Sequence, residues 1–327
     1  MRAHSTDLQG RLLATGQRGD ADIIVWNLTS GAILHKFEEH DVCIAALAFS
    51  DDERVLVSAG SDGTLIAWDL ATGGIIAKAR QDPDPTLTIA FGGFLLDVKG
   101  RPTGVYQFAT AGSKSVCLWG LNPLEGVLAH DRVTLVGLQR DFLSLAFSPL
   151  PGAPWLYAGT SSGDVIIIHT PSKAMHAAVF GAGGGVCALG VLPAAGGSGV
   201  SVWVGGGDGG LLVYDHVATS LEHEAVLNAA AGRSHRVGGG GATAVPGGIA
   251  GTRSFIFARS VRLDGTVWSI APRTPTAYDP APPSCIAGTS AGSIFRIVLT
   301  PVTSVPPSSA ASMSSIAGVG GGAVGAG

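Results

Sequence analysis

The sequence predicts an all-β protein built from repeated small antiparallel sheets, and three observations support this fold class. Short runs of apolar or β-branched residues are separated by turns rich in Asp and Gly. Such turns supply the positive φ angles that tight hairpins need, so the runs between them are typical of neighbouring antiparallel strands. Glycine accounts for 49 of the 327 residues, and only 13% of the residues are charged. These features indicate many turns and a large apolar core, and the length is compatible with one large all-β domain.

The clearest unit lies between residues 40 and 70. Its expected strands are 44–50, 55–60 and 64–70. A single small sheet cannot bury both of its faces, so it requires neighbours of the same kind. A buried Trp N–H and a buried Asp both need hydrogen-bond partners, which predicts a structural network inside this unit. This requirement applies to Trp68 and Asp62.

Units of the same form occur before and after this one. The equivalent ends of the third strand are Trp26, Trp68, Trp119, Ile168, Tyr214 and Ile297. Successive positions are 42, 51, 49, 46 and 83 residues apart. The first four intervals each fit one four-stranded unit of about 40–45 residues plus longer loops. We therefore expect about six units of four antiparallel strands each.

The units differ in how regular they are. The first has second and third strands at 11–17 and 21–27, but too few residues precede them for a well-formed first strand. The third lacks the Asp of the hairpin, so its internal network is expected to be incomplete. The expected strands of the third, fourth and fifth units are 86–91, 107–112 and 115–119, then 142–148, 155–159 and 164–168, then 186–189, 202–205 and 211–215.

The sixth unit is the least regular. Residues 242–245 are its expected first strand, and 284–288 and 293–297 are the next two. An irregular insertion at about 247–283 separates them, since this stretch is too long for a hairpin connection. It contains 255–257 and 266–268, which fit either an extra hairpin or an exposed insertion.

The repeated units occupy residues 1–300, and a segment of different composition follows. Residues 301–327 consist mainly of Pro, Ser, Ala and Gly. Too few large side chains are present there to offset the entropy of ordering. We expect a low-complexity, disordered tail.

Enzyme motifs occur only in contexts that favour hairpins. Gly159–Gly163 and Gly288–Gly292 both match G-x-S-x-G, the turn that carries the nucleophile in many hydrolases. That chemistry requires a helix after the turn, whereas β-branched runs follow here. Gly205–Gly210 matches G-x-G-x-x-G, but no crossover helix is predicted after it. The sequence therefore predicts no catalytic residue and no cofactor-binding residue.

Metal, nucleic-acid and membrane binding are not predicted either. The four cysteines lack C-x-x-C spacing, and His216, Glu222 and His223 lack a recognised ligand pattern and are expected in a solvated loop. The net charge is −4 and no run of Lys or Arg exceeds two residues, which argues against a nucleic-acid partner. Neither a secretory signal nor a membrane span is visible, so we expect a cytoplasmic protein.

The unit at 40–70 resembles a WD40 repeat through His40, Ser58, Asp62 and the Trp68-Asp69 pair. The resemblance implies a β-propeller, in which each sheet is one blade and these four residue types form a hydrogen-bonded chain within the blade. Because a propeller avoids exposed sheet edges by closing its ring, six units with a short first one give a ring that need not close.

Longer segments resemble the N-terminal propeller of a family of cilia- and flagella-associated WD-repeat proteins. They occur in the same order in this chain, at 14–17, 21–26, 44–50, 109–112, 157–166, 209–214 and 287–289. This resemblance implies a non-catalytic scaffold of the ciliary or flagellar axoneme, inside the doublet microtubule, with tubulin and neighbouring axonemal proteins as partners. The alternatives are a general WD40 adaptor, such as a ubiquitin-ligase substrate receptor or a trafficking scaffold, and, from another class, a propeller hydrolase.

Overall fold

The fold consists of strands and turns. The computed structural model describes residues 4–6, 10–16, 21–80, 86–137, 139–150, 152–194, 199–216, 255–273 and 284–298. These residues contain 23 strands and no helix. Accordingly, no helix within them is long and apolar enough to span a membrane.

The described strands form six sheets, and in each sheet neighbours in sequence pair in antiparallel fashion. The first sheet contains β1 (His4–Thr6), β2 (Leu12–Gly16), β3 (Ile23–Asn27) and β4 (Ile33–Phe37). The second contains β5 (Ile44–Phe49), β6 (Val55–Gly60), β7 (Thr64–Asp69) and β8 (Ile75–Arg80). The third contains β9 (Thr86–Leu96), β10 (Pro102–Gly112), β11 (Val116–Asn122) and β12 (Val127–Arg132).

The remaining three sheets follow the same order. The fourth contains β13 (Phe142–Phe147), β14 (Trp155–Thr160), β15 (Asp164–His169) and β16 (Ala174–Phe180). The fifth contains β17 (Val186–Pro193), β18 (Val200–Gly206), β19 (Gly210–His216) and β20 (Phe255–Arg262). The sixth has three strands, β21 (Val267–Arg273), β22 (Ser284–Thr289) and β23 (Ile294–Val298).

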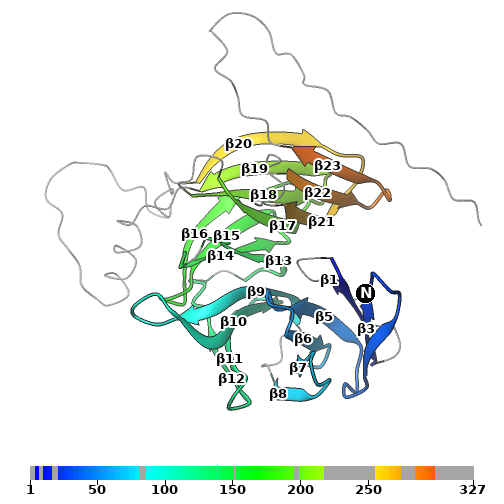
Figure 1. The fold of residues 1–327 in the computed structure, drawn as a ribbon. Coiled ribbons are helices and arrows are strands. Elements are labelled where there is room, and N and C mark those ends of the chain that lie inside the picture. Colours follow the sequence, from blue (N-terminus) through cyan, green and yellow to red (C-terminus); the bar gives the residue numbers. More distant parts are fainter. Residues whose placement is uncertain are drawn as a thin grey trace, which may run out of the picture.

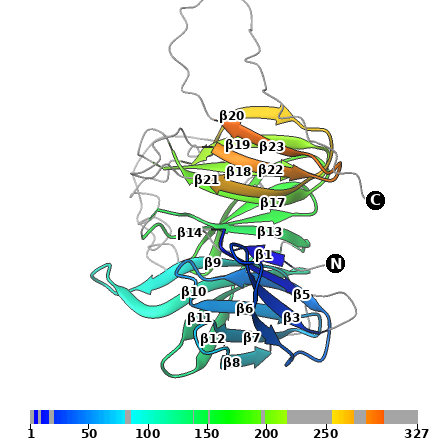
Figure 2. The same ribbon diagram turned by 45° about the vertical axis from the view of Figure 1, so that its right-hand side comes forward.

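The sheets succeed one another in sequence order along an arc (Figures 1 and 2). The first strand of each sheet contacts the first strand of the next, from β1 and β5 through to β17 and β21. Between the sixth sheet and the first, the described residues form no comparable junction, so the arc does not close into a ring. Apolar side chains are exposed on the two end sheets, including Ile33, Trp268 and Ile294.

The core lies between the sheets. In the described residues, five clusters of buried apolar side chains occupy the five junctions, one for each pair of successive sheets. Between the first two sheets, for example, Phe37 stacks on Trp68 with ring centroids 4.2 Å apart. Burying one large apolar side chain stabilises the fold by about 1.5–3 kcal/mol. Each sheet therefore depends on its neighbours, as the sequence predicted for a sheet that cannot stand alone.

The predicted all-β fold with six sheet units is confirmed, and several strands are longer than expected. The first strand is short, with three residues in β1. The third sheet differs most from the expected strand lengths, because β9 and β10 each contain 11 residues. Their long hairpin projects from the arc (cyan in Figure 1).

The region at about 247–283 requires a correction. Phe255–Phe257 begins β20, the fourth strand of the fifth sheet, and Val267 begins β21, the first strand of the sixth. These strands are thus neither an extra hairpin nor an exposed insertion. The interpretation failed because the excess length lies before Phe255, between the third and fourth strands of the fifth sheet, where the repeat normally has a short turn. The expected first strand at 242–245 and the tail at 301–327 lie outside the described residues.

Candidate functional sites: the hydrogen-bonded networks and a surface cavity

Three of the four candidates in the second sheet share hydrogen bonds. Trp68 Nε1 donates to Ser58 Oγ over 2.8 Å, and His40 Nε2 lies 2.7 Å from the same oxygen. Ser58 Oγ also donates to the backbone carbonyl of Ile66 at 3.3 Å. All three side chains are buried. Ser58 is paired with Ile66 and Leu56 with Trp68, so Ser58 and Trp68 stand two register positions apart on one face of the sheet.

Asp62 is not hydrogen-bonded into this network. Its carboxylate oxygens accept from the backbone N–H and the hydroxyl of Thr64, at 3.0 and 2.8 Å. His40 Nδ1 has no hydrogen-bond partner among the described residues. A Cβ built on Gly60 would lie 2.7 Å from Asp62 Oδ1 and 3.0 Å from His40 Nδ1, so both atoms face the same small space. Asp62 therefore acts on His40 through its charge.

Burial sets the protonation state of His40. It lowers the pKa of the imidazole below its ordinary value, and the nearby Asp62 carboxylate opposes that shift. For Asp62 itself, partial burial raises the pKa, but the hydrogen bonds from Thr64 prevail and hold it below the ordinary value. At neutral pH the network thus contains a neutral imidazole beside a carboxylate. No reacting group is exposed by this arrangement, which fits a structural role.

A matching link occurs in the first and third sheets. Trp26 Nε1 donates to Thr15 Oγ1 at 3.1 Å, and Trp119 Nε1 donates to Thr110 Oγ1 at 2.9 Å. In both sheets the hydroxyl stands at the register position that Ser58 occupies in the second. The sequence reasoning missed these pairs because it looked for the hairpin Asp. A Thr or Ser two positions beyond the residue opposite each Trp is the signal that identifies them.

The other three repeat-end positions lack this link. Ile168 is fully buried opposite Leu156, and Ile297 is half-buried against the junction between the fifth and sixth sheets. Tyr214 donates its hydroxyl to the carbonyl of Gly181 at 3.1 Å. Apolar packing is therefore the main interaction of the side chains at these positions.

A second polar contact joins the fourth and fifth sheets. Tyr157 Oη lies 2.5 Å from His216 Nδ1, and both side chains are buried. Burial, reinforced by His176, lowers the pKa of His216 to about 4, so its imidazole is neutral and its Nδ1 can accept a hydrogen bond from the tyrosine hydroxyl. His216 was expected in a solvated loop, but it ends β19 inside the protein. Glu222 and His223 lie outside the described residues, and within these no group of His, Cys, Asp or Glu side chains could hold a metal ion.

The enzyme-like motifs lie at hairpins, as predicted. The turn after Thr160 joins β14 to β15, and the turn after Thr289 joins β22 to β23. The glycine run at 205–210 covers the turn between β18 and β19. In each case a strand follows the turn, so the strand–turn–helix geometry that exposes a nucleophile or cradles a phosphate is not formed there.

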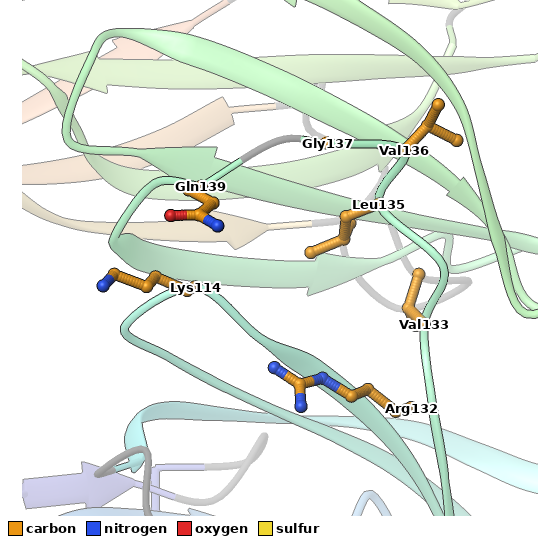
Figure 3. A pocket seen from close by; sticks show the side chains of 7 residues that line it. All are labelled: Lys114, Arg132, Val133, Leu135, Val136, Gly137 and Gln139. Carbon is orange, nitrogen blue, oxygen red and sulfur yellow. The ribbon is translucent and has the colours of Figure 1, made fainter.

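A cavity opens on the surface between the third and fourth sheets (Figure 3). Its volume is about 310 Å³. Lys114 comes from the turn between β10 and β11, Arg132 ends β12, and the other lining residues belong to the connector that leads to β13. The lining consists of Lys114, Arg132, Val133, Leu135, Val136, Gly137 and Gln139. Two cations and one amide thus face an apolar floor. No sequence motif marks this cavity, because a turn, a strand end and a connector meet there only in the folded chain.

Comparison with known proteins identifies the repeat and its relatives. Residues 31–69 match the family described as "WD domain, G-beta repeat". Cilia- and flagella-associated protein 52 of Chlamydomonas reinhardtii is 32% identical over 211 residues, which cover 62% of this chain and 32% of that protein. Centriole proteome protein 16 of the same organism is 34% identical over 128 residues, covering 36% of this chain and 6% of that protein. The chain spans about a third or less of the length of these relatives.

Solved structures support the same fold. The β-propeller domain of Myceliophteria thermophila Cps50 (Swd1) superposes with a TM-score of 0.56 at 17% identity, covering 91% of this chain and 86% of that one. The WD40 repeats of RRP9 superpose with a TM-score of 0.55 at 14% identity, covering 88% and 72%. At such identities the likeness concerns the fold alone. The chain thus has a β-propeller-like fold that remains an open arc, one segment of it matches the WD40 repeat, and it is similar in sequence to cilia- and flagella-associated protein 52.

Proposed function

We propose that this chain is a non-catalytic protein-interaction scaffold of cilia and flagella, a microtubule inner protein of the axoneme that binds tubulin and neighbouring axonemal proteins. The observation that carries the proposal is the 32% identity to cilia- and flagella-associated protein 52 over 211 residues. That match extends over 62% of the chain, well beyond the single repeat at 31–69.

The geometry agrees with a scaffold. Stacked sheets with packed junctions give a stiff framework, and turns at both ends of the sheets offer separate docking positions. The buried polar groups of the second sheet are engaged in holding strands together rather than facing solvent. Along the described part of the chain, the turns that resemble enzyme motifs serve as hairpins. The chemistry available is recognition of other proteins.

Fractionation of axonemes tests this function. A tagged copy of the full chain is expressed in ciliated cells, and demembranated axonemes are washed with increasing salt before the doublet microtubules are sedimented. We expect the chain to sediment with the doublets and to stay after the salt that removes outer-surface proteins, because luminal proteins are shielded. Complete release in that wash would contradict a luminal position. Recovery only in the detergent-soluble cytoplasm would favour a general WD40 adaptor.

A centriolar location is the second candidate. It is favoured by the 34% identity to Centriole proteome protein 16 over 128 residues. Fluorescence imaging of the same tagged chain separates the two locations. Signal along the length of the cilium supports the axonemal proposal, and signal confined to the ciliary base supports the centriolar one.

A further inference from the structure

Backbone strain is concentrated around the surface cavity. In the described residues, only four residues other than glycine have positive φ angles: Glu53, Lys114, Val136 and Lys173. Lys114 and Val136 line the cavity, with φ angles of 72° and 36°. A positive φ is a genuine outlier for a β-branched residue such as Val136. Strained residues of this kind cluster at ligand-binding sites, where the surrounding structure maintains them.

Hydrogen bonds to β11 and to two turns hold this connector in place. Val133 donates its N–H to the Val116 carbonyl at 2.9 Å, and Thr134 donates to the Lys173 carbonyl at 2.9 Å. Lys173, which receives the Thr134 bond, is the third strained residue. Lys114 is fixed in turn by donating its N–H to the Arg140 carbonyl at 3.1 Å. Three of the four strained residues thus belong to one bonded assembly. The lining is pre-formed, which lowers the entropy lost when a ligand binds.

The charge of the lining is positive, although the whole chain carries a net charge of −4. Figure 3 shows Lys114, Arg132 and Gln139 directing polar groups to the same side of the cavity. No carboxylate lies among the described lining residues. An anionic group would therefore complement this site.

The apolar part of the lining narrows the choice of ligand. Leu135 forms a buried floor, whereas Val136 at the rim is 76% exposed. A small inorganic anion gains nothing from such surfaces, but a peptide that carries both carboxylates and an aliphatic side chain uses both. We propose that the cavity between the third and fourth sheets docks an acidic segment of a partner protein, with a carboxylate facing Lys114 and an aliphatic side chain against Leu135 and Val136. One partner of the scaffold would thus carry an acidic segment, and this holds whether the scaffold lies in the axoneme or in the centriole.

A peptide-binding assay on the purified full chain tests the proposal. The probe is a fluorescein-labelled peptide, Glu-Glu-Leu-Glu-Glu, and the comparison peptides are Gln-Gln-Leu-Gln-Gln and Glu-Glu-Ala-Glu-Glu. Fluorescence anisotropy gives the dissociation constant. We expect the all-glutamine peptide to bind about tenfold more weakly than the acidic probe. Added salt should weaken binding of the acidic probe, since exposed charge pairs are screened. The alanine peptide is expected to bind more weakly than the leucine peptide.

Two variants and a matched control locate the binding. Lys114→Glu should weaken binding of the acidic peptide about tenfold, because it reverses a charge that faces the ligand. Lys99→Glu makes the same charge change in the exposed turn between β9 and β10 and should leave binding within about twofold of the original protein, as expected for a remote surface charge. Val136→Gly should raise the melting temperature because it relieves strain. It should nevertheless weaken peptide binding, because a looser connector loses more entropy on binding.

Three outcomes would overturn the proposal. One is equal affinity for the acidic and all-glutamine peptides. Another is an equal loss of binding in Lys114→Glu and Lys99→Glu, which would show an unspecific charge effect. The third is displacement of the peptide by millimolar inorganic phosphate with no preference for leucine over alanine, which would identify a simple anion site. None of these outcomes bears on the axonemal fractionation, so the two proposals can fail separately.

Discussion

The first three sheets and the last three solve the same packing problem by different means. At the end of the third strand, the first three sheets place a Trp whose N–H donates to a hydroxyl on the neighbouring strand. The last three place Ile168, Tyr214 and Ile297 there. The residues at the hydroxyl position in those sheets are Ala158, Val204 and Ala287. The sheets nevertheless pair and stack alike. Packing of the sheet face therefore defines the blade, and the hydrogen bond is an addition made where a Trp stands at the repeat end.

This difference predicts where each half is sensitive. A buried N–H that loses its acceptor retains the full cost of its desolvation, about 1–3 kcal/mol. An aliphatic residue at the same place has no such requirement, so only loss of volume harms it. Removing a hydrogen-bond acceptor should thus destabilise the first three sheets more than a comparable change destabilises the last three. The cost of truncating an apolar side chain should depend on its burial in both halves.

Truncation of the repeat-end residue should give the largest effect. Trp68→Ala is expected to lower the free energy of unfolding by about 3–5 kcal/mol, because Trp68 is 2% exposed and stacks on Phe37 of the first sheet. Ile297→Ala removes a smaller, half-buried side chain and should cost less than about 2 kcal/mol. Urea unfolding followed by Trp fluorescence and circular dichroism measures both. Equal losses would mean that burial does not decide the outcome at this position.

Exchange of the hydroxyl tests the polar difference directly. Ser58→Ala leaves the Trp68 N–H and His40 Nε2 without their shared partner and should cost about 1–3 kcal/mol. The reciprocal variant, Ala158→Ser, adds a hydroxyl to the fourth sheet, where the Ile166 carbonyl stands opposite in the register. It should cost less than about 1 kcal/mol, since the new hydroxyl can donate to that carbonyl. The melting temperatures of the two variants give the comparison, and a larger loss in Ala158→Ser would refute it.

Sequence patterns predicted most of the fold because the repeat is encoded locally. The strands of the second sheet were expected at 44–50, 55–60 and 64–70 and are found at Ile44–Phe49, Val55–Gly60 and Thr64–Asp69. Alternating apolar runs and Asp-Gly turns carry this information within each unit. The assignment failed at Phe255 and Val267 because a long connector there separates a strand from its own sheet. Local periodicity does not report which sheet a strand joins.

Candidate sites were less predictable, for a physical reason. The link between Ser58 and Trp68 follows from strand register, and the sequence indicated it. The position of Asp62 depends on the conformation of one turn, in which Thr64 captures the carboxylate. The cavity depends on a positive φ at Val136, and no residue preference signals such strain in advance. Features set by tertiary packing therefore escaped the sequence reasoning.

Acid should destabilise the junction between the fourth and fifth sheets. Burial lowers the pKa of His216 to about 4, from an ordinary value near 6.5. Between these values the unfolded chain binds a proton that the folded protein refuses, so stability falls as pH decreases from about 6.5 to 4. The loss between pH 7 and pH 5 should be about 2 kcal/mol for this one group. Denaturant unfolding at both pH values measures it, and His216→Gln should reduce the difference. An unchanged difference would assign the acid sensitivity to another group, such as His40, whose pKa burial also lowers.

Removal of the Asp62 carboxylate should have the smallest effect. Its hydrogen bonds go to Thr64 in an exposed turn, so Asp62→Ala should cost about 1 kcal/mol or less, clearly below Ser58→Ala. Asp62→Asn is the matched control, because it retains an oxygen that can accept the Thr64 N–H while removing the charge. If Asp62→Ala instead cost as much as Ser58→Ala, the carboxylate would have to accept a hydrogen bond from His40 Nδ1 in solution, and the second sheet would hold all four residues in one chain. Thermal unfolding of the three variants thus decides whether the network ends at His40 or continues into the turn.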